Sequence, residues 1–453
     1  MGTIQNYIKT SKKQNNDIIY FPLSIHLFIH TFLYILLAIV SLNNSVIATS
    51  IISLIIIIYF LVSKPNEHFY FILGFVPFEN LARVGEVNVF FLFLLISLGK
   101  LIISNKEAKY NVIGIIGFMY LVGIEVFNEI NNISMGELIN VLIIILYFFF
   151  FIALSNVKFY DVSRMIQNYI ASYLVVIVQV IVSYGSLNNF MMLVASESEI
   201  TRFGEEATNL GGAMGLPIYS AIVVSMVTSY YVLNSCLKPF IRGLIILIGL
   251  TASLIGILTI SRSFLMMMIA YLLIIVLSGS GFYKKKIIKV LSLIFAISLV
   301  MYFMYSDIIN NLITKFLIRV NYDSGVGIRG EIWGSCFVYL KEHPIGYIFG
   351  YGIRSYVNIG LINNLEFKAL AHNLYLDSIM SIGLVGVACI FYLLSIFRAK
   401  LKNTFNTPVK LISSMPLIVF LVFGFSGLSL NYLKTWIYVL AFIAFTYALP
   451  KKQ

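Results

Sequence analysis

The sequence predicts an all-α integral membrane protein, a polytopic bundle of about 12–14 transmembrane helices with one long extracytoplasmic loop. Three observations predict this fold. Hydrophobic residues make up 60% of the 453 residues and charged residues only 11%, whereas an ordinary soluble domain has roughly 25% charged residues. Apolar runs of the roughly 20 residues that cross a bilayer recur along the whole chain. Lysines gather between alternate runs. We therefore expect a single membrane domain covering 1–453.

The apolar runs define the expected helices in order. A short run near 68–79 contains Pro77 and is expected to be a broken or re-entrant helix; counting it places both termini on the same side. The polar, basic N-terminus precedes a run without a cleavage site, so we expect that run to be retained as the first anchor. The other expected spans are 20–41, 45–63, 87–104, 110–128, 137–156, 165–186, 210–234, 240–259, 262–279, 286–306, 373–397, 408–427 and 431–449.

The basic residues predict the orientation. With both termini in the cytoplasm, most lysines lie in or beside cytoplasmic segments, as the positive-inside rule requires. The net charge of +12 is then explained by anionic lipid, so we expect a bilayer partner and no nucleic acid. Arginine behaves differently. Six of the nine arginines fall on the extracytoplasmic side, namely Arg83, Arg202, Arg262, Arg319, Arg329 and Arg354. A guanidinium binds phosphate through two hydrogen bonds and stays charged, so this asymmetry favours a phosphate-binding role.

Two extracytoplasmic loops are long enough to carry function. The loop over 307–371 is too long for a connector and is expected to contain helices that lie on the membrane surface. A second loop, over 187–209, contains the run ESEITRFGEEATN.

Several residues on the extracytoplasmic side are candidates for binding a substrate. Arg202 precedes a span and either reaches the outer interface or pairs with Glu205 or Glu206 at helical spacing. Arg262 lies at the boundary of two spans joined by almost no loop, where an ionisable group is functional unless it extends to the interface.

The long loop contributes further candidates. Arg329 and Trp333 are four residues apart and share a helical face; the indole either anchors at the lipid headgroups or stacks on a sugar. Arg354 follows two glycines and either closes on a ligand or stabilises a turn. Tyr351 belongs to a group of tyrosines in this loop that can stack on pyranose rings.

His372 opens the span that follows the long loop. At a helix N-terminus the dipole disfavours the imidazolium, so the ring is expected to be neutral and able to accept a proton. It is therefore a candidate general base, with a structural helix cap as the alternative. No extracytoplasmic loop offers a tight carboxylate or His/Cys cluster, and we expect neither a metal site nor a cofactor.

Four motifs, taken in order, resemble the O-antigen ligase and polymerase superfamily of bacterial membrane glycosyltransferases. They are an arginine before a mid-chain span, a Ser-Arg pair at a span boundary, R-x-x-x-W followed by P-x-G-x-x-x-G, and His-Asn before G-x-x-G. Their residues here are Arg202, Ser261, Arg262, Arg329, Trp333, Pro344, Gly346, Gly350, His372, Asn373, Gly383 and Gly386.

The resemblance implies a glycosyltransferase C-like fold in the bacterial cytoplasmic membrane, with the active site on the periplasmic side. It implies metal-independent transfer of glycan from undecaprenyl diphosphate to an acceptor hydroxyl. Arg202, Arg262 and Arg329 would contact the diphosphate, and His372, beside Asn373, would orient or deprotonate the acceptor. Arg319 and Arg354 match no motif as firmly and are supporting candidates. Glu205 and Glu206 are also candidates, and would assist or orient His372 if their loop folds over it.

Three functions remain open on the sequence. The first is a polymerase that joins lipid-linked repeat units of an O-antigen or capsule, with a chain-length regulator as a possible protein partner. The second is the ligase that passes finished polymer to lipid A core, which the motifs do not separate from the first. The third is a flippase or other transporter, which the crowding of candidate residues on one face and the absence of repeated halves disfavour.

Overall fold

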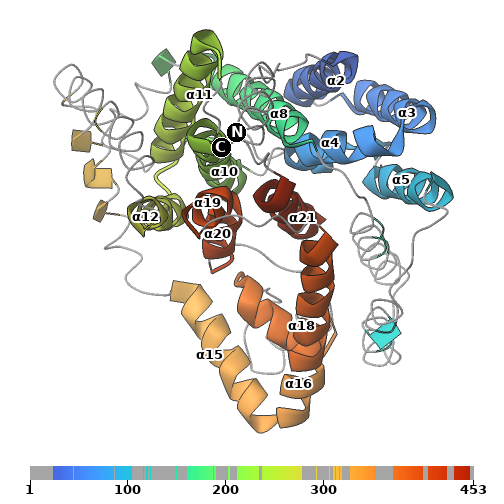
Figure 1. Cartoon of the computed structure of the whole chain (residues 1–453), viewed down its shortest axis with the longest axis vertical. Coiled ribbons are helices and arrows are strands. Elements are labelled where there is room, and N and C mark those ends of the chain that lie inside the picture. Colours follow the sequence, from blue (N-terminus) through green and yellow to red (C-terminus); the bar gives the residue numbers. More distant parts are fainter. Residues whose placement is uncertain are drawn as a thin grey trace, which may run out of the picture.

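The chain forms a bundle of helices with a lobe at one edge, shown in Figure 1 as a computed structural model. The structure describes residues 24–43, 45–85, 87–104, 161–186, 212–233, 237–277, 327–352, 371–400, 407–425 and 433–448, together with short pieces between them. The expected spans over 110–128, 137–156 and 286–306 fall largely or wholly outside these ranges.

The described helices follow the predicted spans closely. Five of them are long and apolar enough to cross a membrane, and four shorter apolar helices accompany them. The multi-pass, all-α prediction is therefore confirmed. The spanning helices and their shorter companions are α2 (Ile25–Leu42), α3 (Val46–Val62), α5 (Phe90–Ser104), α8 (Val162–Ser183), α10 (Gly212–Leu233), α11 (Pro239–Leu258), α12 (Arg262–Leu277), α18 (Leu374–Lys400) and α21 (Leu433–Ala448).

Two predicted spans are interrupted. The run near 68–79 forms α4 (Pro65–Phe75) and then a 3-10 helix, η1 (Val76–Leu81), where Pro77 cannot donate the next helical hydrogen bond. A hairpin of β1 (Arg83–Val84) and β2 (Val87–Asn88) follows. The run over 408–427 forms α19 (Thr407–Ser413) and α20 (Met415–Phe423) instead of one helix.

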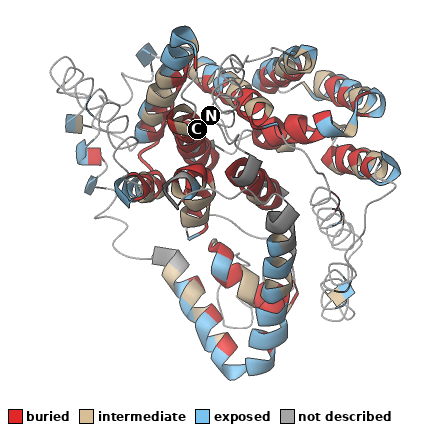
Figure 2. Cartoon of the chain, in the orientation of Figure 1, coloured by how far each residue is buried: buried red, intermediate tan, exposed pale blue. Residues whose placement is uncertain are grey.

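Burial distinguishes central helices from peripheral ones. The apolar window of α10 is 83% buried, against 33% for α2 and α11, so α10 lies in the interior and the other two present wide apolar faces outward. Figure 2 shows the same contrast, with α10, α4 and α21 largely buried and α3 largely exposed on its outer side. Apolar side chains facing outward from a spanning helix are expected where lipid is the solvent.

A separate small core holds the lobe together. The lobe consists of α15 (Gly327–Glu342), α16 (Pro344–Phe349) and α18, and it projects from the bundle in Figure 1. Its buried residues are Ile332, Cys336, Leu340, Ala371, Leu376 and Met380. The helices α15 and α16 lie within 307–371, so part of that loop is helical as expected.

Candidate active site

Trp333 joins the long loop to the start of α18. Its indole Nε1 donates to the carbonyl oxygen of Ala371 at 2.7 Å, and the half-buried ring packs against the small core of the lobe. The structure therefore gives Trp333 a positioning contact that neither alternative from the sequence included. This bond places the R-x-x-x-W helix beside the residue that precedes His372.

The carboxylate of Asp377 fixes the same segment from the other side. Asp377 is fully buried, and its Oδ1 accepts a hydrogen bond from the N–H of Ala371 at 3.1 Å. Both polar groups of the Ala371 backbone are thus held, the N–H by Asp377 and the carbonyl by Trp333. The chain entering His372 is consequently tied to two helices.

His372 itself does not open the helix, which corrects the sequence prediction. The helix α18 begins at Leu374, and its capping residue is Asn373, whose Oδ1 accepts from the N–H groups of Tyr375 at 3.1 Å and Leu376 at 3.3 Å. Asparagine is a stronger N-cap than histidine, because its side-chain oxygen reaches the unpaired N–H groups of the first turn. His372 is half-buried and has a φ of 50°, a backbone conformation that is uncommon outside glycine.

The glycine motifs serve a close approach of two backbones. Gly383 breaks the helical geometry of α18 with a φ of 61° and a ψ of −177°, and a Cβ there would lie 2.3 Å from the oxygen of Ile348. A Cβ on Gly350 would lie 2.5 Å from the oxygen of Ser381. Only glycine fits at either position.

The break in α18 leaves carbonyl groups that the loop satisfies. The N–H of Tyr351 donates to the oxygen of Met380 at 2.8 Å, and the N–H of Gly352 donates to that of Ser381 at 2.9 Å. Each orphan carbonyl thus gains a partner, as helix ends require. The P-x-G-x-x-x-G and G-x-x-G motifs are two sides of one contact.

Tyr351 is engaged within the lobe. Its hydroxyl donates to the oxygen of His343 at 2.9 Å, and its ring meets that of Tyr339 edge-on with centroids 5.0 Å apart. Tyr339 stacks on His343 at 4.2 Å. Burial raises the pKa of Tyr351 to about 12, with the neighbouring Tyr339 as the second cause. In this structure the ring packs on protein, and a sugar contact for it stays a prediction.

Arg262 occupies the first position of α12. The carbonyl of Ser261 accepts from the N–H of Leu265 at 3.2 Å, and the Ser261 hydroxyl lies 2.8 Å from that of Ser263. Ile260, just before the turn, has a φ of 48°. This tight turn places the half-buried Arg262 at the very end of α12.

The segment carrying Arg202 meets this turn. Phe203 is fully buried, and its N–H donates to the oxygen of Leu258, the last residue of α11, at 3.2 Å. Its ring stacks on Tyr184 with centroids 5.9 Å apart. Phe203, which follows Arg202 in the sequence, therefore lies beside the turn that precedes Arg262.

Contacts among α10, α12, α19 and α20 show where the lobe lies along α12, the helix that begins at Arg262. Thr228 and Tyr271 share a hydrogen bond of 3.0 Å, and Ser229 donates to the oxygen of Ile412 at 2.6 Å. Ile412, near the end of α19, therefore lies level with Tyr271, in the second half of α12. Since α20 packs against α12 and rises about 13 Å over its length, it ends near the level of Arg262.

The end of α20 then contacts α18. The carbonyl of Gly424 accepts from the N–H of Leu374 at 2.7 Å, and the hydroxyl of Tyr375 donates to the oxygen of Leu421 at 2.8 Å. The start of α18, with His372 and Asn373 before it, thus adjoins the end of the bundle at which α12 begins.

Two helices, α12 and α15, carry an arginine in the first turn, where the helix dipole disfavours positive charge. Arg262 and Arg329 both lie in the first turn of their helices, and neither first turn contains an acidic residue. The positive end of a helix dipole favours anions, so basic residues there are unfavourable by a few tenths of a kcal/mol or more. Such an exception is expected where an anion binds.

Other predicted site residues lie outside the described part of the chain. These are Arg202, Glu205, Glu206, Arg319 and Arg354. For Arg329 the structure gives the position on α15, one turn before Trp333, and nothing of its side chain.

A known protein family matches the part of the chain that contains α12, α15, α16 and the start of α18. Residues 247–391 match the family described as O-antigen ligase. This region is similar to the O-antigen ligase family, which supports the predicted O-antigen ligase/polymerase superfamily. The match covers less than half of the chain but includes Arg262, Arg329, Trp333 and His372. The O-antigen ligase family is one of glycosyltransferase-like membrane enzymes, so the predicted family and the general class of activity are confirmed. A search of curated proteins finds no match.

The sequence analysis did not identify two residues that support this region. Asp377 lies five residues after His372, in the first turn of α18. The Tyr120 hydroxyl, which donates to the oxygen of Phe349 at 2.5 Å, carries no local pattern that reveals it.

Proposed function

We propose that the protein polymerises a surface polysaccharide, an O-antigen or a capsule. The growing glycan is transferred from undecaprenyl diphosphate to the non-reducing end of a lipid-linked repeat unit. The protein would lie in the bacterial cytoplasmic membrane with both termini in the cytoplasm and its active site outside. The bilayer would then supply both donor and acceptor.

The placement of Arg262 and Arg329 in first turns without acidic residues carries this proposal. A diphosphate bound there would meet guanidinium groups and helix N–H groups together, which turns two unfavourable placements into favourable ones. Charge that develops on the departing diphosphate would be stabilised by the same groups. No metal ion is needed for that role, in line with the expectation from the sequence.

His372 would handle the acceptor. The acceptor hydroxyl attacks the anomeric carbon, the bond from that carbon to the phosphate oxygen breaks, and the lipid diphosphate leaves with the bonding electrons. The hydroxyl proton passes to the imidazole of His372. The contacts of Ala371 and Asn373 with their helices fix the chain on both sides of this ring, which supports a positioned base.

Ligation to lipid A core is the second candidate, and the description of the matching family favours it. The chemistry is the same apart from the acceptor. Purified protein given only a lipid-linked repeat unit separates the two: a polymerase lengthens it, whereas a ligase needs the lipid A core acceptor as well.

The direct test replaces the motif residues in a strain that lacks the chromosomal copy. Arg262→Lys and Arg329→Lys are each expected to abolish polymer, because lysine keeps the charge but loses the bidentate contact with phosphate. His372→Ala should do the same, because it removes the group that accepts the proton of the acceptor hydroxyl. Polymer is measured by gel electrophoresis of surface glycan, and protein amount by immunoblot of membranes.

Arg83→Lys is the matched control. Arg83 is exposed and matches none of the four motifs, and its Nε donates to the nearby oxygen of Asn80 at 2.9 Å, so polymer should be unchanged. Near-normal polymer from the three motif variants at normal protein amounts would refute the proposal. Surface glycan consisting of single repeats indicates a lost polymerase, and glycan missing altogether from lipid A core indicates a lost ligase.

A further inference from the structure

A second polar cluster lies at the opposite end of the bundle. Ser163, at the start of α8, lies 3.2 Å from the hydroxyl of Tyr230 near the end of α10, so the start of α8 adjoins the end at which α10 and α12 finish. Arg262 is at the other end of α12. The cluster at the start of α8 contains His26, His30, Tyr59, Glu67, Asp161, Arg164 and Asn168.

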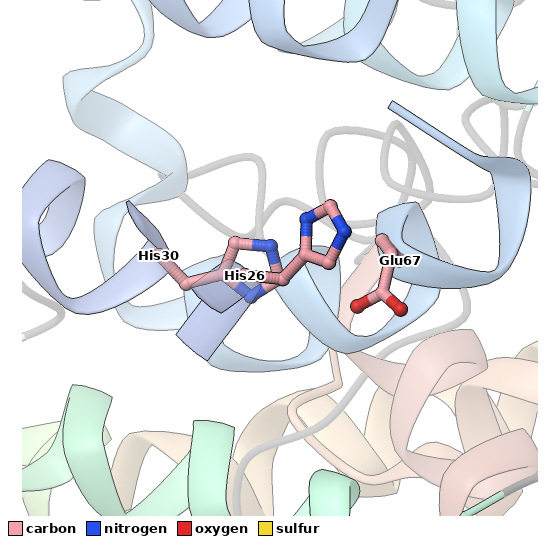
Figure 3. Close-up of side chains that lie close together, drawn as sticks. All are labelled: His26, His30 and Glu67. Carbon is pink, nitrogen blue, oxygen red and sulfur yellow. The ribbon is translucent and has the colours of Figure 1, made fainter. Parts of the chain in front are cut away.

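Three of these side chains converge on one point. His26 and His30 are four residues apart on one face of α2, and Glu67 approaches them from α4 (Figure 3). One potential ligand atom from each lies within 4.8 Å of the others. His30 and Glu67 are buried, whereas His26 is half-buried. Two imidazoles and a carboxylate form a ligand set that zinc uses.

The hydrogen bonds around His30 determine which ring nitrogen carries its lone pair. Asn168 donates its Nδ2 to the oxygen of Arg164 at 2.9 Å, so its Oδ1 faces His30 and accepts from Nδ1 at 2.6 Å. The proton of neutral His30 is then on Nδ1, and Nε2 carries the lone pair. A histidine that binds a metal through one nitrogen commonly donates the other N–H in this way.

The hydroxyl of Tyr59 occupies the point that both histidines face. It lies 2.6 Å from Nε2 of His30 and 3.1 Å from Nδ1 of His26. A zinc ion with ligands at about 2.0 Å holds the ligand atoms roughly 3.3 Å apart. Side-chain rotations that move these atoms by about an ångström would bring them to that separation. Tyr59 is only half-buried, and its oxygen can move aside or become the fourth ligand.

The charges of the cluster favour a cation. Glu67 forms an ion pair with Arg164, and Arg164 also lies 3.6 Å from Asp161. With neutral histidines the group carries two carboxylates and one guanidinium, hence a net charge of −1. A divalent ion would change this to +1, without leaving a large unbalanced charge in the bundle.

We propose that His26, His30 and Glu67 bind a zinc ion that ties α2 to α4 at the end of the bundle opposite the candidate active site. The expectation of no metal site considered only the extracytoplasmic loops, and this site is not in them. Its distance along α12 from Arg262 makes its role structural, not catalytic.

The test measures zinc in protein purified without a polyhistidine tag. After dialysis against buffer with and without zinc, the untagged protein is expected to retain about one zinc per chain by mass spectrometry of the metal. His26→Ala and Glu67→Gln should each lower the zinc content at least tenfold. Tyr59→Phe should retain zinc, because a water can complete the coordination.

Two histidines elsewhere supply the controls. His343 is exposed and His372 lies in the other site, so His343→Ala and His372→Ala should both keep full zinc content. Since His26 is half-buried, its variant should fold even if one at His30 does not, and size-exclusion chromatography confirms folding. A wild-type protein without stoichiometric zinc, or equal losses in the His26 and His343 variants, would overturn the proposal.

Discussion

The two polar regions of this molecule are built in opposite ways. In the lobe, the contacts run mainly to backbone groups: Trp333 and Asp377 hold Ala371, and Gly383 lets two backbones meet. At the start of α2, side chains pair with side chains, as in the contacts of His30 with Asn168 and Tyr59. Backbone contacts fix the path of the chain in the lobe, whereas the network at the start of α2 joins side chain to side chain.

This difference separates two uses of polar residues in a membrane bundle. A region that must bind a large substrate gains from fixing the chain path and leaving side chains for the substrate. A region that only holds helices together gains from closed pairs, since unpaired polar groups in an apolar setting are costly. Variants that act on stability alone, or on transfer alone, therefore test the comparison.

Gly383→Ala is expected to have the largest effect. The added Cβ would meet the oxygen of Ile348 at 2.3 Å and force a non-glycine residue into a positive φ, which should lower the free energy of unfolding by more than about 2 kcal/mol. Thermal unfolding of purified protein measures it.

Gly334→Ala is the control for that substitution. Gly334 lies in α15 with nothing within 4 Å of an added Cβ, so alanine should stabilise by up to about 1 kcal/mol. Equal stability of the two variants would show that backbone contact does not hold the lobe.

Tyr59→Phe tests the opposite region. Removing the hydroxyl takes the hydrogen-bond donor from Nε2 of His30, which should cost about 1–3 kcal/mol of stability in metal-free protein. Glycan transferred per folded chain should stay the same, because this cluster lies away from Arg262. A selective loss of transfer at full stability would break the distinction between the two regions.

Trp333→Phe should give the reverse result. Phenylalanine keeps a ring in the small core but loses the bond to Ala371, at a cost of about 1 kcal/mol. Because the lost bond places the residue before His372, transfer should decrease about fivefold. An assay of polymer per folded chain measures it. Phe337→Leu, on the exposed face of α15, should change neither property, and a matching decrease there would remove the role of the indole N–H.

Labelling of the buried Cys336 thiol tests whether the small core of the lobe is closed, without changing any residue of that core. Burial, and then the charge of Asp377, raise the pKa of its thiol to about 12, compared with about 8.5 for a free thiol. The thiolate is the reactive form, so at pH 8 maleimide labelling should be about a thousandfold slower than for a free cysteine. Between pH 9 and pH 11 its rate should still rise tenfold per pH unit, where that of a free thiol levels off.

The measurement uses a chain with Cys236→Ser and Cys389→Ser, which leaves Cys336 as the only thiol. Asp377→Asn should shift the labelling curve to lower pH by removing the negative charge. Labelling of Cys336 as fast as that of an unfolded control would show that the lobe core is open.

The sequence predicted the helices well because lipid imposes one simple rule, an apolar run of fixed length. Motif order, and for the arginines their asymmetry, also predict roles for Arg262, Arg329 and His372, and these roles stay predictions. The sequence could not predict that Asn373 caps α18 in place of His372, because both polar residues precede the same apolar run. Nor could it find the His26 cluster, because His30, Glu67 and Asn168 are distant in sequence and only folding brings them together. The four-residue spacing of His26 and His30 was the one local signal.

The bond between Leu374 and Gly424 bears on how the protein is made. The N–H that starts α18 receives its acceptor from a residue synthesised fifty positions later. During translation the lobe can insert, but the segment entering His372 cannot reach its final anchorage until the ribosome has produced α20. Under the proposed function, His372 would reach its place only at a late stage of biogenesis, so a half-made chain would not act on lipid-linked sugars.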